Sequence, residues 1–188
     1  MDRRELLKMV ALATGGVVTG GEFFLAGCKN KDAAVAGTAF SDNDIKFLDE
    51  VAETIIPKTT TAGAKEAEVG KFMMMMVNDC YDEADQKIFH EGMERLNRAC
   101  KNLHGAEFMK ATPEIRKTYL KELDFDAKIY TKDKKKEDPT HYFTMMKQLT
   151  LLGYFTSKPG LEQNFNYQQV PGKYDGAVPY KKGDKLFV

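Results

Sequence analysis

Histidine, cysteine and methionine are the residues of this chain that could bind a metal or support redox chemistry, and their spacing does not favour either. His90 and His104 fall on one predicted helix, where a rise of 1.5 Å per residue separates them by roughly 20 Å, too far to share an ion. The four methionines at 73–76 point in different directions around a helix, so their sulfurs cannot converge. We interpret them as deformable packing groups, in the core or against a partner. His141 follows a capping turn and is expected to face solvent.

Cys80 and Cys100 both fall on apolar helix faces. We interpret them as buried free thiols. The alternative is a disulfide between them, which an oxidising compartment would permit. No pair of cysteines or histidines has the spacing of a zinc or haem site.

The sequence motifs of the common catalytic and cofactor sites are missing too. There is no G-x-S-x-G, no H-E-x-x-H, no C-x-x-C-H and no glycine-rich phosphate loop after a strand. Lysine plus arginine and aspartate plus glutamate both total 28, so a neutral chain has no general attraction to nucleic acid. We therefore expect no catalytic residue, cofactor or metal in this chain and no nucleic-acid partner.

The N-terminal residues 1–27 are typical of a processing segment rather than of a fold. Arg3 and Arg4 in "DRRELLK" precede a glycine-diluted apolar run that is too short for a transmembrane helix, which needs about 20 apolar residues. This stretch resembles a twin-arginine export signal, and "LAGC" resembles a bacterial lipobox that directs cleavage before Cys28 and lipid attachment to its sulfur. The alternative is an amphipathic start of the first helix.

Together these signals predict a lipid-anchored protein on the periplasmic side of a bacterial cell envelope. Residues 28–40 are small and polar, and we expect them to form a flexible tether between the lipid and the fold.

Residues 41–188 predict one all-α domain of about five helices with an extended, irregular C-terminal tail over 157–188. The capping-box-like "SDND" at Ser41 starts a helix that ends at Pro57. Residues 71–81 are apolar on every side, so this second helix should be buried or covered.

A long helix is expected from Asp82 to about His104, and Thr112 begins the next one. A charged loop over 131–138 leads to the last helix, which should start near Pro139. The apolar stripes of the long helix and of the last helix are Phe89, Met93, Leu96, Cys100 and Leu103, and Tyr142, Met145, Met146, Leu149, Leu152 and Gly153, respectively.

Three stretches, 55–72, 149–160 ("LTLLGYFTSKPG") and 167–179 ("YQQVPGKYDGAVP"), resemble the gluconate 2-dehydrogenase subunit 3 family. The first departs from the family pattern at Thr60, Ala62 and Glu68. In the third, Ala177 replaces a common cysteine, so a disulfide or redox role does not transfer. The resemblance covers roughly residues 41–180.

The resemblance implies a non-catalytic small subunit of a membrane-bound flavoprotein dehydrogenase. The large partner would be a glucose–methanol–choline type oxidoreductase that holds FAD, oxidises a sugar or sugar acid and passes electrons to a cytochrome c or a quinone. Because its flavin is loaded in the cytoplasm, a partner without its own signal would need a folded-protein export route. The predicted interface residues are Tyr154, Phe155, Thr156, Ser157, Tyr167, Pro171, Gly172, Tyr174, Gly176 and Pro179.

Two other functions fit the sequence. The chain could be a stand-alone periplasmic lipoprotein that binds a small molecule in a helical groove, or an enzyme in its own right. The first predicts ligand-dependent stabilisation of the isolated chain. The second predicts turnover of sugar substrates without a flavoprotein.

Overall fold

The structure is a computed structural model that describes residues 40–170, 172–173 and 175–188. The expected signal segment 1–27 and nearly all of the expected tether lie outside the described residues, and so do Pro171 and Tyr174.

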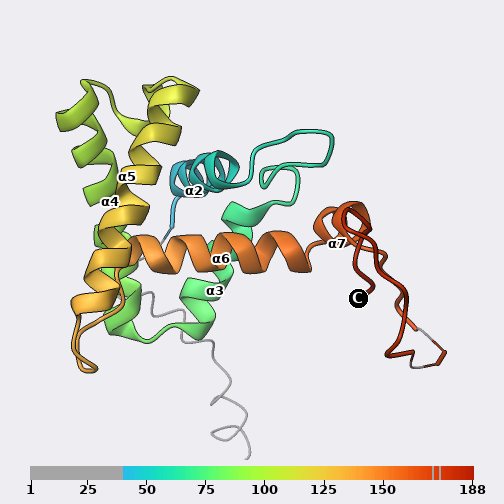
Figure 1. Cartoon of the computed structure of the whole chain (residues 1–188). Coiled ribbons are helices and arrows are strands. Elements are labelled where there is room, and N and C mark those ends of the chain that lie inside the picture. Colours follow the sequence, from blue (N-terminus) through green and yellow to red (C-terminus); the bar gives the residue numbers. More distant parts are fainter. Residues whose placement is uncertain (1–39, 171, 174) are drawn as a thin grey trace, which may run out of the picture. The chain divides into compact units, whose positions relative to one another are not determined.

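Helices make up most of the described part of the chain, which confirms the all-α class (Figure 1). The elements in chain order are α2 (Asp42–Ile55), α3 (Val69–Cys80), α4 (Glu83–His104), the 3-10 turn η2 (Phe108–Lys110), α5 (Pro113–Asp133), α6 (Tyr142–Thr156) and α7 (Lys158–Asn164). Within the described residues, β-type pairing is limited to one isolated bridge between Asn166 and Phe187. The tail over 157–188 was expected to be irregular throughout, but it begins with the short helix α7.

The helix boundaries follow local sequence signals. The Ser41 side chain accepts a hydrogen bond from the Asp44 amide, and the Asp44 carboxylate accepts one from the Ser41 amide at 2.8 Å, which completes the capping box. The side chains of Asp82 and Thr112 cap α4 and α5, since each accepts a hydrogen bond from the amide three residues later. Gly105 ends α4 in the left-handed conformation, with a φ of +76° that favours glycine.

Helix α3 takes its cap from another helix. Its N-cap residue Glu68 makes no side-chain cap, and the Asp49 carboxylate of α2 accepts a 2.8 Å hydrogen bond from the Gly70 amide instead. Burial raises the pKa of Asp49, and the bond from Gly70 partly opposes that rise. The start of α3 is therefore fixed by its packing on α2.

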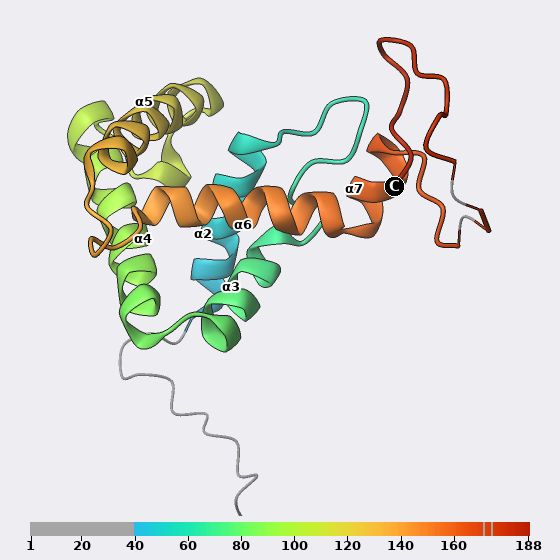
Figure 2. The same cartoon turned by 60° about the horizontal axis from the view of Figure 1, so that its bottom comes forward.

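Helix α6 is the central element of the core. It contacts each of the other α-helices of the described part, and it runs through the middle of them in both views (Figures 1 and 2). Its inner face buries Phe143, Met146 and Leu149. The largest side chains that are fully buried with them are Tyr154, Phe89, Phe108, Leu48, Met73 and Leu96. Burial of this apolar surface is the main stabilising contribution.

Helix α3 is covered on one side only by the rest of the described chain. Met73 and Val77 are buried, whereas Met75 is 51% exposed. Two expectations about apolar stripes are wrong, because Leu103 and Leu152 are 67% and 47% exposed on faces that no neighbouring described helix covers.

The two described cysteines differ from each other. Both are free thiols, but Cys100 is buried as expected whereas Cys80 is exposed at the C-terminal end of α3. The expectation of a buried thiol is therefore confirmed for Cys100 and wrong for Cys80.

The charged connection between α5 and α6 lies three residues later than expected, at 134–141 instead of 131–138. Helix α5 continues to Asp133, and α6 begins only at Tyr142. His141, expected to face solvent, is half-buried and caps α6, since its Nδ1 accepts a hydrogen bond from the Phe143 amide at 3.2 Å. Burial, reinforced by Arg95 and opposed by Asp126, lowers the pKa of His141 below its ordinary value.

We predict that His141→Asn reduces the loss of stability on acidification between about pH 7 and pH 5. Because the pKa of His141 is lower in the folded chain, the unfolded chain binds protons more readily as the pH falls, which lowers the free energy of unfolding. Asparagine accepts the same cap hydrogen bond without titrating. Urea unfolding followed by circular dichroism across this range measures the slope. If the free energy of unfolding falls equally steeply with pH in the variant and the parent, His141 does not contribute to the loss of stability.

Candidate functional site

The junction between α6 and α7 is fixed by one serine hydroxyl. Ser157 Oγ donates to the Tyr154 carbonyl at 2.6 Å and accepts from the Gly160 amide at 3.1 Å, so it ends one helix and caps the next. A Cβ at Gly160 would lie 1.8 Å from the Tyr154 carbonyl oxygen, so only glycine fits there. This contact explains physically why a serine and a glycine stand three residues apart in "SKPG".

Tyr154 ties this junction to a loop much earlier in the chain. Its hydroxyl donates to the Ala62 carbonyl at 2.7 Å and accepts from Asn164 Nδ2 at 3.1 Å. The Ala62 amide donates to Gln163 Oε1 of α7 at 2.6 Å. Two of the stretches that carry the family resemblance, 55–72 and 149–160, are therefore in direct contact.

The loop between α2 and α3 is organised by a single carboxylate. Glu53 accepts hydrogen bonds from the amides of Lys58 and Lys65, each at 2.9 Å. The Ala64 amide donates to the Ile56 carbonyl at 3.1 Å. These bonds hold the Ala62 carbonyl in place for Tyr154.

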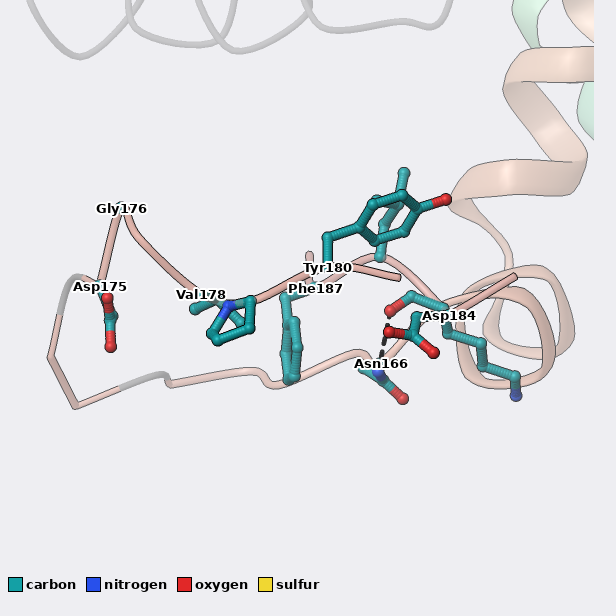
Figure 3. Close-up of a pocket in the computed structure, with 10 residues that line it drawn as sticks. Asn166, Asp175, Gly176, Val178, Tyr180, Asp184 and Phe187 are labelled. Atoms are coloured by element: carbon teal, nitrogen blue, oxygen red, sulfur yellow. Dashed lines mark hydrogen bonds between the residues drawn. The ribbon is translucent and has the colours of Figure 1, made fainter. Parts of the chain in front are cut away.

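Beyond α7 the tail folds back on itself. The Asn166 amide donates to the Leu186 carbonyl at 2.8 Å, and its side-chain Nδ2 donates to the Lys185 carbonyl at 2.9 Å (Figure 3). The Gln168 amide donates to the Val188 carbonyl at 3.0 Å. The last residues of the chain therefore lie beside the residues that follow α7.

A groove of about 570 Å³ lies within this folded tail, lined from both of its limbs (Figure 3). Its side chains include Asn166, Val178, Tyr180 and Phe187. The carboxylates of Asp175 and Asp184, which also line it, accept hydrogen bonds from the amides of Ala177 and Lys181 and stabilise local turns. The groove thus combines apolar and aromatic surface with two carboxylates that stabilise the surrounding turns.

The tail exposes an unusually apolar surface for its length. Seven of its residues are 42–76% exposed: Tyr167, Val170, Val178, Tyr180, Leu186, Phe187 and Val188. We call this set the tail surface. Phe155, at the end of α6, is 39% exposed and stacks edge-on against Phe165. A large exposed apolar patch on a folded chain marks an interaction site.

The predicted interface residues are distributed unequally. Phe155, Thr156, Tyr167, Gly172, Gly176 and Pro179 are exposed, and Ser157 is half-buried. Tyr154 is only 2% exposed, so in this structure it offers a partner almost no surface and acts as an internal anchor. Pro171 and Tyr174 lie outside the described residues. The predicted interface residues did not include Tyr180, Leu186 or Phe187, which the structure also exposes in the tail.

Other kinds of site find no support in the described residues. Among them, no group of three or more histidine, cysteine, aspartate or glutamate side chains could hold a metal ion. No described helix has the length and apolar character needed to cross a membrane.

We predict that Tyr154→Phe lowers the free energy of unfolding by about 1–3 kcal/mol, because the Ala62 carbonyl and the Asn164 amide both lose a buried partner. Tyr180→Phe is the matched control, since this exposed tyrosine makes no hydrogen bond through its hydroxyl within the described residues. Urea unfolding measures the free energy of unfolding of both variants. A Tyr154→Phe variant as stable as the control would show that the anchor does not matter.

The family model described as Gluconate 2-dehydrogenase subunit 3 matches residues 42–172, more than half of the chain. Searches among curated proteins and among solved structures found no match. The matched residues include every helix described above and the first part of the tail. The chain therefore belongs to the gluconate 2-dehydrogenase subunit 3 family.

Proposed function

We propose that this chain is a non-catalytic small subunit that binds, co-exports and membrane-anchors a flavin-dependent dehydrogenase. The observation that carries the proposal is the tail surface, whose aromatic and aliphatic side chains are exposed next to a rigidly fixed helix junction. Membership of a family named after a dehydrogenase subunit supplies the class of partner.

The chemistry belongs to the partner in this proposal. The partner is a large flavoprotein of the glucose–methanol–choline type that holds FAD, oxidises a sugar or sugar acid and delivers electrons to a cytochrome c. The small subunit contributes contact surface and no reacting group. Tyr167, Tyr180 and Phe187 are suited to this role, because aromatic side chains supply a large share of binding energy at protein interfaces.

Export and anchoring rest on the sequence outside the described residues. Arg3 and Arg4 act as the export signal, and Cys28 carries the lipid that holds the complex on the periplasmic side of the envelope. A small helical domain has little need to cross a membrane in the folded state, whereas a flavoprotein that acquires FAD in the cytoplasm does.

We predict that Tyr167→Ser combined with Val170→Ser weakens recovery of the flavoprotein in co-purification by at least about tenfold, because two exposed apolar contacts are lost. Both residues are exposed, so the melting temperature of the subunit should stay the same. The matched control is Phe125→Ser with Ile129→Ser, which removes exposed apolar groups from α5 instead. Equal recovery with both pairs of substitutions would exclude the tail surface as the interface.

We predict that Arg3→Lys with Arg4→Lys leaves both the subunit and the flavoprotein in the cytoplasm, since the partner depends on this signal. Fractionation with an activity stain for the dehydrogenase measures the distribution. Cys28→Ser is the companion variant, and it should release an active complex from the membrane without blocking export. A flavoprotein that reaches the periplasm with the lysine variant would disprove co-export.

A further inference from the structure

A cleft of about 700 Å³ lies between α2, α5 and α6, and no residue of the tail lines it. These three helices contact one another pairwise. Ile55, Leu120 and Phe143 give the cleft an apolar lining, and the last two are buried. Its volume is within the range of small-molecule sites.

The three carboxylates of the cleft are already engaged. Glu50 pairs with Arg116 and Lys65. Asp124 pairs with Lys128 at 2.8 Å and Lys147 at 2.5 Å. Burial would raise the pKa of Asp124, but the hydrogen bonds from these two lysines hold it below its ordinary value.

The third carboxylate, Glu53, is engaged by the two loop amides described above. Each of the three acidic groups therefore accepts two donors. Basic side chains balance the charges of Glu50 and Asp124, whereas the charge of Glu53 is stabilised by two neutral backbone amides.

The guanidinium group of Arg116 in the cleft also has its partners within the chain. Arg116 donates from Nε to the Phe108 carbonyl and from Nη2 to the Met109 carbonyl, both at 2.8 Å, while its Nη1 pairs with Glu50. Its side chain is only 13% exposed. Arg116 thus joins α5 to α2 and η2 and holds the cleft open.

Two lysines remain. Lys117 and Lys121 both line the cleft, one helical turn apart on α5, and neither forms an ion pair or a side-chain hydrogen bond within the described residues. The lining of the cleft has four basic and three acidic side chains, so one positive charge is in excess. Both lysines are exposed at its rim, where they can reach an anion from solvent.

We propose that this cleft binds a small organic anion with an apolar body, whose carboxylate or phosphate group contacts Lys117 and Lys121. The body packs on the accessible apolar residues of the lining, Ile55, Pro57 and Pro113. The site does not involve the tail surface and does not depend on the proposed partner. The chain could bind the flavoprotein without binding an anion in this cleft, and it could bind the anion without binding the flavoprotein.

Isothermal titration of the full chain without any partner tests the site directly. The probes are 2-naphthoate and 2-naphthyl phosphate as amphipathic anions, 2-naphthalenemethanol as the neutral analogue and acetate as the anion without an apolar body. We expect saturable binding of one or both amphipathic anions, at least about tenfold tighter than either control, and weakening as salt rises. The better of the two anions shows which head group the lysines prefer.

Lys117→Gln with Lys121→Gln should weaken binding of that anion at least about tenfold. The matched control is Lys46→Gln with Lys132→Gln, which removes the same total charge from exposed lysines outside the cleft and should leave the affinity unchanged. Circular dichroism of both variants confirms that they are folded.

Three results would overturn the inference. One is equal affinity in the two double variants, which would make binding a general charge effect. Another is binding of the neutral analogue as tight as that of the anions. The third is an acidic peptide that binds through Lys117 and Lys121 when no small anion does, which would make the cleft a contact for a protein segment. The effect of Tyr167→Ser with Val170→Ser on flavoprotein binding tests the proposed function separately, and it neither supports nor contradicts anion binding in the cleft.

Discussion

The hydrogen bond from the Tyr154 hydroxyl to the Ala62 carbonyl is the contact on which the rest of this structure depends most directly. It joins residues 92 positions apart and brings the α2–α3 loop against the point where α6 gives way to α7. Glu53 holds the loop from one side, and Ser157 holds the helix junction from the other. The start of the tail is therefore set by buried and well-satisfied polar groups.

This arrangement separates two surfaces with different chemistry. The tail beyond α7 exposes apolar side chains, and two of its carboxylates, Asp175 and Asp184, stabilise local turns. The cleft between α2, α5 and α6 is built from ion pairs over an apolar floor. The first suits a broad contact with another protein and the second a compact ligand, so the same small domain has room for two independent functions.

The sequence predicted best what depends on a few neighbouring residues. The caps at Ser41, Asp82 and Thr112 act on amides within three positions, and Gly105 needs only its own backbone conformation. The exposure of Met75 was out of reach, because it depends on which face of α3 its neighbours cover. Periodicity and composition cannot supply that information for a helix that is apolar all round.

The same limit applies to the candidate site. Tyr154 stands among aromatic residues at a helix end, so the family pattern suggests a surface role, but its hydroxyl partner comes from a distant loop. Helix α7 has local start signals, since Ser157 caps the Gly160 amide and a proline stands in its first turn, but it is only seven residues long and lies in a stretch rich in glycine and proline. Phe187 and Val178 line one groove only because the tail folds back through Asn166.

The contrast between Cys80 and Cys100 also matters for work at the bench. Cys80 is open to solvent at the end of α3, whereas Cys100 is buried, and burial raises the pKa of its thiol, so little reactive thiolate forms there. If the sulfur of Cys28 carries a lipid, a thiol reagent added to the native protein would attach a spectroscopic reporter at Cys80 alone. The wild-type sequence therefore already contains a single position from which distances to a partner could be measured without any engineered cysteine.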